Sequence, residues 1–496
     1  MASTVPLSSG AREFLATARR GLWIDNAYVD AASEGDIVSE NPATGEVLGT
    51  VQAAAAEDVH RAVDSARRAF EGPWSRLSPD DRSRLLFRVA ELVEAHVDEL
   101  SALETLECGK PIAFTREYDL PTVSGMFRYF AGWCTKHTGQ VIPVSAGNFH
   151  TYTRHEPVGV CAGIIPWNSP LAMAAWKLAP ALACGNTMIL KPAEQTPLTA
   201  LRLAELIRDA GVPPGVVNVL PGYGEVAGAA LAEHDGVDKV AFTGEHLTGR
   251  KIVAASAGNL KRVSLELGGK SPNIVFPDAP GDVVEGSMWG IFYNSGQSCS
   301  AGSRLFVHKD RHDEVLERLA AAAAALRIGP GIAQDTEIGP LISREQLERV
   351  VRYLDGARRD AATIRGGDRP DDGSLAGGYF VAPAVVSDTT NDARIAREEV
   401  FGPVVTVLPF GTEEELIAKA NDTSFGLGAG VWTSDVKRAH RVAAGIRAGT
   451  VWINCYGVAD PAAPFGGFRM SGYGREMGSY ALDLYSEVKC VWTNLD

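Results

Sequence analysis

The chain has 496 residues, enough for two or three domains, and its 45% hydrophobic and 22% charged residues are ordinary for a globular enzyme or binding protein. A formal net charge of −14 argues against a nucleic-acid partner or an anionic membrane surface, and no stretch is as apolar as a membrane span. The first twenty residues lack the apolar region of a secretory signal. Seven scattered cysteines without zinc-site spacing favour reduced thiols in a cytoplasm.

The first strong helix signal begins at Ser78-Pro79, a polar N-cap followed by proline at the first helical position. Gly109 and Pro111 are typical helix-ending residues, so the pattern predicts one helix between these limits. Its apolar positions recur at helical spacing: Leu85, Leu86, Val89, Leu92, Val93 and Val97.

From about residue 158 the pattern changes to short apolar runs, "VGVCAGII", "TMIL", "GVVNVL" and "KVAFTG", each followed by a helical stretch. This alternation predicts a parallel sheet flanked by helices. A second α/β alternation follows residue 270. Its expected strands lie near 304–308, 403–408, 428–432 and 449–454, and its helices near 312–327, 412–421 and 434–446.

Ligands of open α/β sheets bind beyond the carboxyl ends of the strands, so the loops after these runs are candidate sites. "PWNSP" (166–170) follows the first run, "KPAEQTP" (191–197) the second and "FTGEHLTG" (242–249) the fourth. "ELGGKSP" (266–272) precedes a fifth run and supplies a carboxylate and a lysine.

"FYNSGQSCSAGSR" (292–304) places Cys299 among small residues. A lone cysteine is more often an inert buried thiol than a nucleophile, and a nucleophile needs a group that removes its proton. Glu266 and Glu399 are candidates, but neither is near in sequence. "GQSCS" does not match the G-x-S-x-G motif of serine hydrolases. "GYGEVAG" is more typical of a turn than of a dinucleotide-binding loop. The histidines do not cluster at the spacing of metal ligands. We therefore expect no metal.

The order of the motifs along the chain favours a nucleophilic Cys299 over an inert one. "PWN", "KPAEQTP", "FTG…TG", "ELGGKSP", "GQxC", "EEVFGPV" and "PFGGFRMSGYGRE" occur in this order and at similar separations in one family. The chain closely resembles the aldehyde dehydrogenase superfamily over nearly its whole length. "LELGGKSPNIV" and "GQSCSAGSR" are the most specific stretches.

The resemblance implies NAD-dependent oxidation of an aldehyde to a carboxylic acid through a cysteine thiohemiacetal and an acyl-thioester. It makes Cys299 the nucleophile, and it places the Asn168 side chain with the Cys299 backbone N–H at the oxyanion. Glu266 becomes the general base that hydrolyses the thioester, which indicates a branch that does not acylate coenzyme A. Lys177 and Glu476 match a pair that relays protons.

The resemblance also implies a nucleotide cleft. Glu194, with Lys191, matches a position that binds the adenosine ribose hydroxyls, and a carboxylate there repels a 2′-phosphate, so NAD is favoured over NADP. Glu245 departs from the common serine at its position and brings negative charge toward the pyrophosphate, with Thr248 and Lys251 as candidate compensation. The other expected cofactor-binding residues are Trp167, Gly222, Gly224, Gly244, Gly249, Leu267, Glu399 and Phe401.

The expected aldehyde pocket is wider and more polar than in familiar members, because Ser169 replaces a common phenylalanine and Ala459 a common aromatic residue. We expect a medium-size, aromatic or branched aldehyde or a semialdehyde. The remaining expected lining residues are Trp176, Tyr293, Ser298, Ser300 and Phe465.

The implied fold class is α/β: a Rossmann-like nucleotide-binding domain (1–136 and 158–267), an α/β catalytic domain (268–477), and oligomerisation elements (137–157 and 478–496) built on a small β-hairpin. A homodimer or homotetramer follows, because a long exposed hairpin has an unpaired edge. A non-catalytic scaffold and a thioesterase using the same cysteine are the competing functions. NADH production with an aldehyde separates the dehydrogenase from both.

Overall fold

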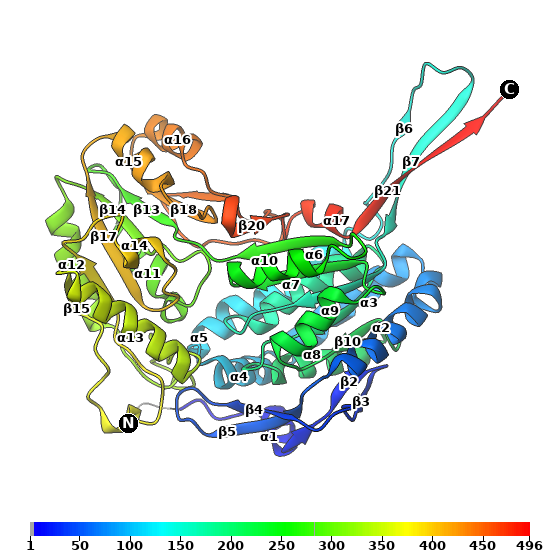
Figure 1. Cartoon of the computed structure of the whole chain (residues 1–496), viewed down its shortest axis with the longest axis horizontal. Helices are drawn as coiled ribbons and strands as arrows, with labels where there is room; N and C mark the ends of the chain where they lie inside the picture. Colours follow the sequence, from blue (N-terminus) through cyan, green and yellow to red (C-terminus); the bar gives the residue numbers. More distant parts are fainter. Residues whose placement is uncertain (1–3, 282) are drawn as a thin grey trace.

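Two large sheets organise the chain, with two smaller sheets at its periphery (Figure 1). The structure is a computed structural model, and it describes residues 4–281 and 283–496. Within these ranges, no helix is long and apolar enough to cross a membrane.

The first large sheet has eight strands in the order β20-β12-β11-β8-β9-β10-β2-β3. The central strands β12, β11, β8, β9 and β10 are mutually parallel, whereas β20, β2 and β3 pair in antiparallel fashion at the edges. The bounds, in that order, are Gly472–Tyr473, Arg262–Leu267, Lys239–Gly244, Val160–Ile164, Thr187–Lys191, Val217–Val219, Leu22–Ile24 and Ala27–Val29. The four apolar runs predicted from sequence are β8, β9, β10 and β11, so that prediction is confirmed.

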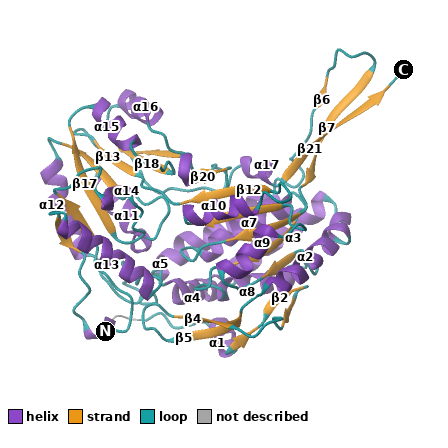
Figure 2. Ribbon diagram, in the orientation of Figure 1, coloured by secondary structure: helices purple, strands orange, loops and turns teal. Residues whose placement is uncertain are grey.

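Both faces of this sheet are buried, which explains why its strands are continuously apolar rather than alternating. Val160 and Ala162 pack in a cluster with α2 (Ala56–Glu71), α9 (Ala229–Glu233) and α10 (His246–Ala255). Cys161, between them, packs in the opposite cluster with α3 (Pro79–Ala95), α6 (Leu120–Ala131), α7 (Pro170–Ala183) and α8 (Leu198–Asp209). The helices thus cover the sheet from two sides (Figure 2).

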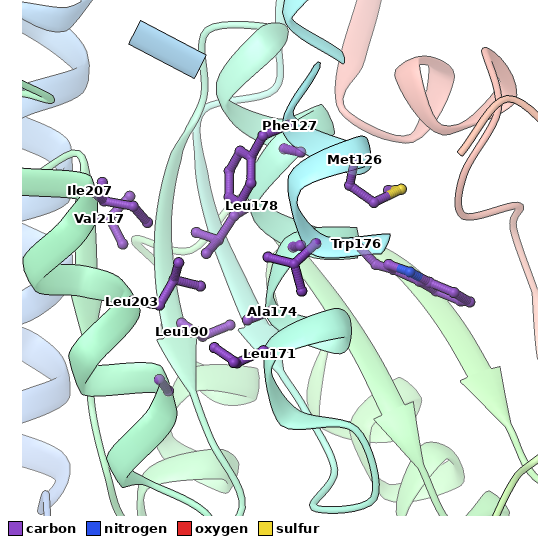
Figure 3. Close-up of a cluster of buried hydrophobic side chains, with 14 of the residues drawn as sticks. Met126, Phe127, Leu171, Ala174, Trp176, Leu178, Leu190, Leu203, Ile207 and Val217 are labelled. Atoms are coloured by element: carbon purple, nitrogen blue, oxygen red, sulfur yellow. The ribbon is translucent and has the colours of Figure 1, made fainter. Parts of the chain in front are cut away.

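Figure 3 shows the second of these clusters, in which side chains of α6, α7 and α8 meet those of β9 and β10. Phe127, Leu178 and Leu203 lie inside it, and Trp176 points away from its centre. The labelled residues are Met126, Phe127, Leu171, Ala174, Trp176, Leu178, Leu190, Leu203, Ile207 and Val217. This packing fixes the position of α7, which carries several of the candidate site residues.

The second large sheet has seven strands in the order β15-β16-β17-β14-β13-β18-β19, all parallel except β15. Its expected strands and helices are confirmed to within three residues. In that order the strands are Thr363–Gly366, Ala384–Ser387, Val404–Phe410, Arg304–His308, Pro272–Val275, Gly428–Trp432 and Thr450–Ile453. The helices that pack with it are α11 (Val283–Phe292), α12 (His312–Ala325), α13 (Arg344–Arg359), α14 (Arg394–Arg397), α15 (Glu413–Asn421) and α16 (Val436–Gly445).

The single helix predicted between Ser78 and Gly109 is wrong, because the structure has two. Ser78 does cap α3, accepting a hydrogen bond from Asp81 N at 3.2 Å. The helix ends at His96, whose φ of −111° and ψ of 23° leave the helical region, and α4 (Val97–Cys108) follows. Gly109, with φ of 81°, ends α4 as expected. Apolar spacing alone did not reveal the break.

A three-stranded sheet projects from the body as an arm, with the C-terminus at its far end (Figure 1). It pairs β6 (Val141–Ile142) with β7 (Phe149–Pro157) and β7 with β21 (Ser486–Asn494), all antiparallel. The pairing of the 137–157 segment with the C-terminal strand is therefore confirmed. The remaining elements are β1 (Arg19–Arg20), β4 (Asp36–Glu40) and β5 (Val47–Gln52), which form the other small sheet, and the helices α1 (Ser9–Ala16), α5 (Ile112–Phe114) and α17 (Tyr480–Leu484).

Candidate active site

The loop that carries Cys299 is held in an unusual backbone conformation. Asn294, Ser295 and Gly296 have φ of 49°, 55° and 71°, three consecutive residues in the left-handed region. A Cβ at Gly296 would lie 2.0 Å from the carbonyl oxygen of Gly402, so only glycine fits there. Part of the small-residue pattern around the cysteine thus serves close backbone packing. The thiol itself is half-buried.

The Asn168 side chain is tied to this loop. Its Nδ2 donates to the carbonyl oxygen of Gln297 at 3.0 Å, and Asn294 Nδ2 donates to the carbonyl oxygen of Asn168 at 3.0 Å. Gln297 in turn accepts a hydrogen bond from Ile342 N at 3.0 Å. Two segments that are 126 to 129 residues apart are therefore held together, and one amide hydrogen of Asn168 remains for another acceptor.

Glu266 lies on β12 and is almost fully buried, with 1% of its surface exposed. Neither of its carboxyl oxygens has a hydrogen-bond partner. Burial raises its pKa to about 8, the charge of Glu476 adds to the rise, and Lys177 and the Cys299 side chain oppose it. Burial, followed by Glu266 and Glu399, raises the pKa of the Cys299 thiol well above its usual value. The thiol and the carboxyl thus form one coupled pair in a dry environment.

Lys177 and Glu476 form a buried ion pair behind Glu266. Lys177 Nζ also donates to Thr243 Oγ1 at 2.6 Å, and Thr243 is paired with Glu266 across β11 and β12. The second carboxyl oxygen of Glu476 has no partner. The backbone of Glu476 bonds in both directions to Phe465, with N–O distances of 2.7 and 2.8 Å. The predicted relay pair is therefore placed directly beside the predicted base.

The expected ribose-binding residues also lie together. Lys191 Nζ is 3.5 Å from Glu194 Oε1, and the same oxygen accepts a hydrogen bond from Gly224 N at 2.5 Å. Burial lowers the pKa of Lys191, and Glu194 opposes that change. Gly228, nearby, lies against the Lys191 side chain. The structure thus gathers the "KPAE" loop and the "GYGEVAG" turn at one place.

The N-terminus of α10 lies in the "FTGEHLTG" loop. Glu245 is its N-cap residue, is exposed, and makes no capping hydrogen bond, and Thr248 and Lys251 are also exposed. A Cβ at Gly249 would lie 2.9 Å from the Leu267 side chain, which explains the close approach of α10 to β12. The free backbone N–H groups of this first turn are a suitable place for an anion, although Glu245 brings a competing charge.

Glu399 and Phe401 contact the loops that carry Gly269 and Trp167. Glu399 Oε1 accepts a hydrogen bond from Gly269 N at 3.0 Å, and the Phe401 ring packs edge-on against Trp167 at 5.3 Å. Burial raises the pKa of Glu399 to about 7, the Gly269 hydrogen bond lowers it, and Glu245 adds a smaller rise. The Glu245 charge therefore acts on the Glu399 carboxyl.

The structure brings some of the expected pocket residues together. Trp176 and Phe465 pack edge-on at 5.4 Å, and the indole N–H of Trp176 has no partner. Ser298 and Ser300 flank the thiol with their Oγ atoms 3.5 Å apart. Ala459 is exposed.

Comparisons with known proteins identify the family. The model of the "Aldehyde dehydrogenase family" matches residues 28–491. DhaS of Bacillus subtilis (strain 168) is 54% identical over 478 residues, covering 96% of both chains. The mitochondrial aldehyde dehydrogenase of Homo sapiens is 48% identical over 476 residues, covering 95% of this chain and 91% of the other.

This chain belongs to the aldehyde dehydrogenase family. Among solved structures, the NAD⁺ complex of aldehyde dehydrogenase from Bacillus cereus is 48% identical and covers 100% of both chains, with a TM-score of 0.97. PnpE, solved in complex with nicotinamide adenine dinucleotide, is 49% identical with a TM-score of 0.94 and covers 96% of this chain and 98% of the other. The α/β fold expected from the motifs is thereby confirmed.

Sequence reasoning missed a second buried cluster in this aldehyde dehydrogenase. Lys110 forms an ion pair with Asp119, and its Nζ donates to Ser169 Oγ at 2.7 Å. Tyr293, an expected lining residue, donates to Asp119 Oδ1 at 3.3 Å. Glu104 accepts a hydrogen bond from the backbone N–H of Leu171 at 3.2 Å. Charged residues in the otherwise apolar region 100–112 were the available signal, and their burial was not visible from sequence.

Proposed function

We propose that this aldehyde dehydrogenase oxidises an aldehyde to a carboxylic acid, with Cys299 as the nucleophile and Glu266 as the general base. The observation that carries the proposal is the coupling of a half-buried thiol with a buried, unpartnered carboxyl, beside an asparagine amide tied to the same loop. An inert structural cysteine needs none of these features.

In the first half-reaction, the sulfur adds to the aldehyde carbon and the carbonyl oxygen becomes an oxyanion. Glu266 takes the thiol proton, since burial raises the pKa of this carboxyl to about 8 and so makes its carboxylate a stronger base. The free amide hydrogen of Asn168 and the Cys299 N–H stabilise the oxyanion, each such donor being worth about 3 kcal/mol. A hydride then leaves the carbon, and the oxyanion collapses to a thioester.

In the second half-reaction, the thioester is hydrolysed. The Glu266 carboxylate takes a proton from water as the water oxygen adds to the acyl carbon, and the sulfur then leaves as thiolate. The carboxylic acid is released and Cys299 is restored. Glu476 and Lys177, buried behind Glu266, pass the proton onward, for which the unpartnered oxygen of Glu476 is suited.

Bound NAD supplies the acceptor for the hydride. The residues present fit such a group: Lys191 and Glu194 are arranged for ribose hydroxyls, α10 offers its N-terminus to a pyrophosphate, and Trp167 with Phe401 forms an aromatic wall near the thiol. The Bacillus cereus enzyme and PnpE were both solved with this dinucleotide.

We infer a preference for NAD over NADP from Glu194, whose carboxylate repels a 2′-phosphate. Glu194→Lys is expected to raise the NADP-to-NAD ratio of kcat/KM by about tenfold, measured as NADPH and NADH absorbance. Equal use of both cofactors by the wild-type protein would contradict this role. Lys437→Ala is a matched control, because it removes an exposed charge on α16, away from the residues assigned to the cofactor.

The finer features proposed from the family resemblance concern assembly, location and substrate. The three proposed domain segments correspond broadly to the two large sheets and the projecting arm, although β20, from the 268–477 segment, joins the first large sheet. The arm exposes Val488 and Trp492, which supports pairing with a second copy in a homodimer or homotetramer. All seven cysteines are free, which supports a reducing cytoplasm. The substrate is a medium-size, aromatic or branched aldehyde or a semialdehyde.

The direct test is NADH formation from NAD and an aldehyde panel by the wild-type protein and by Cys299→Ser. The wild type should produce NADH, and the serine variant should lose at least ~10³-fold in kcat, because a serine hydroxyl is a far weaker nucleophile. Cys490→Ser, an exposed cysteine on the arm, is the matched control and should retain activity. Turnover by Cys299→Ser close to wild type would overturn the proposal.

A further inference from the structure

The second buried cluster controls a hydroxyl group beside the active site. Lys110 is fully buried and pairs with Asp119, and its Nζ lies 2.7 Å from Ser169 Oγ. Ser169 directly follows Asn168 and stands at the N-terminus of α7, yet it makes no capping hydrogen bond to that helix. Its side chain therefore has a purpose other than helix capping.

The chemistry of the two groups fixes the role of the serine. A lysine ammonium has only donors, so Ser169 Oγ must be the acceptor in their hydrogen bond. The one hydroxyl hydrogen of Ser169 is then left over, and no residue in 4–281 or 283–496 accepts it. A half-exposed donor oriented by a buried charge is a recognition group for an oxygen atom of a ligand.

The charge balance of the cluster determines which kind of oxygen it suits. Burial would lower the pKa of Lys110, but its neighbours, Asp119 first, raise it above its usual value, and Asp119 matches the ammonium charge in an ion pair. Burial and the neighbouring Asp119 raise the pKa of Glu104 well above its usual value, and Lys110 opposes the rise. The cluster thus has no excess positive charge for a carboxylate, and it suits a neutral ether, hydroxyl or carbonyl oxygen.

The surroundings of the cluster are aromatic. The Tyr293 ring, whose hydroxyl donates to Asp119, packs 5.0 Å from Phe114, and Phe114 packs 5.6 Å from Trp289. Tyr118, at 6.2 Å from Phe114, is 58% exposed and extends this wall to the surface. A single polar donor within such a wall discriminates more strongly than one in water, because an unmatched donor there stays unpaired.

We propose that Ser169 is a specificity-determining residue that donates a hydrogen bond to a neutral oxygen a few bonds from the aldehyde carbon, so that oxygen-bearing aldehydes are preferred to hydrocarbon ones of the same shape. This inference rests on the proposed function. Its position next to Asn168, whose amide faces the reacting carbonyl in that function, sets the short separation between the two substrate oxygens.

The test uses an isosteric pair, methoxyacetaldehyde and butanal, which differ by one oxygen in place of a methylene group. For the full-length wild-type enzyme, kcat/KM should favour methoxyacetaldehyde, and Ser169→Ala should lower the ratio of the two values about fivefold to tenfold. The change should come mainly from KM for methoxyacetaldehyde. Ser83→Ala, which removes a serine hydroxyl on α3 that bonds to the Ala131 carbonyl oxygen, should leave the ratio unchanged.

The possible outcomes are distinct. An unchanged ratio in Ser169→Ala, with the same melting temperature as wild type, overturns the inference. A larger loss with 4-oxobutanoate than with methoxyacetaldehyde overturns the assignment to a neutral oxygen. Failure of the wild type to form NADH from either aldehyde overturns the proposed function instead.

Discussion

Two buried lysine clusters lie around helix α7, and they have the same components. In one, Lys177 pairs with Glu476 and donates to Thr243 Oγ1 at 2.6 Å. In the other, Lys110 pairs with Asp119 and donates to Ser169 Oγ at 2.7 Å. Beside each pair lies a second buried carboxyl whose pKa burial raises, to about 8 for Glu266 and well above normal for Glu104.

The clusters differ in how the second carboxyl is held. Both oxygens of Glu266 are unpartnered and the carboxyl interacts with the Cys299 thiol, whereas one oxygen of Glu104 accepts a hydrogen bond from the backbone N–H of Leu171 and the other has no partner. In the Lys110 cluster the hydroxyl hydrogen of Ser169 is a further unpaired group, and Ser169 is half-exposed. The same combination of a buried ion pair and a hydroxyl therefore presents a proton acceptor in one place and a hydrogen-bond donor in the other. Burial alone does not make a carboxyl catalytic.

The largest effect expected from this comparison separates the two carboxyls. Glu266→Gln should lower kcat about 10²–10⁴-fold, because the amide cannot take a proton from water. Glu104→Gln, the matched variant, should change kcat by less than about threefold, since the amide oxygen can still accept the Leu171 N–H and Glu104 takes no part in the proposed proton transfers. Steady-state NADH formation measures both. Equal losses in the two variants would contradict the division of roles.

The two lysines should contribute similarly to stability. Lys177→Met and Lys110→Met each leave a buried carboxylate without its partner, which costs about 3–5 kcal/mol of unfolding free energy. The double variant Lys110→Met/Asp119→Leu should recover most of that cost, because no uncompensated charge remains. Urea unfolding followed by tryptophan fluorescence provides the comparison. Single variants as stable as wild type would show that the carboxylates are not charged in the folded protein.

A smaller effect concerns pH. Glu266 acts as a base only when deprotonated, so kcat limited by deacylation should rise with pH through about 8, the pKa that burial gives this group. Glu476→Gln removes a negative charge that raises this pKa, so the midpoint should move to lower pH by up to about one unit. Asp119→Asn should leave the midpoint where it is. A midpoint that Glu476→Gln moves upward would contradict the electrostatic coupling.

The sequence predicted much of the fold and one of the two clusters. Strands β8, β9, β10 and β11 were visible because strands buried on both faces are continuously apolar, and "ELGGKSP" and "GQxC" directed attention to Glu266 and Cys299. The break at His96 was missed because the apolar spacing continues through it. Lys110 and Asp119 were missed because nothing local distinguishes a buried charge from an exposed one. The role of this ion pair depends on the tertiary contact between Lys110 and Ser169.

The most direct test of the central claim is the intact mass of Glu266→Gln after mixing with NAD and butanal. If Cys299 forms a thioester that Glu266 helps to hydrolyse, the variant should accumulate one acyl group per chain, and peptide mapping should place it on Cys299. The wild-type protein should show little of this adduct, and Cys299→Ser/Glu266→Gln should show none. Absence of an acyl adduct in Glu266→Gln, with NADH formed in the first turnover, would contradict the account.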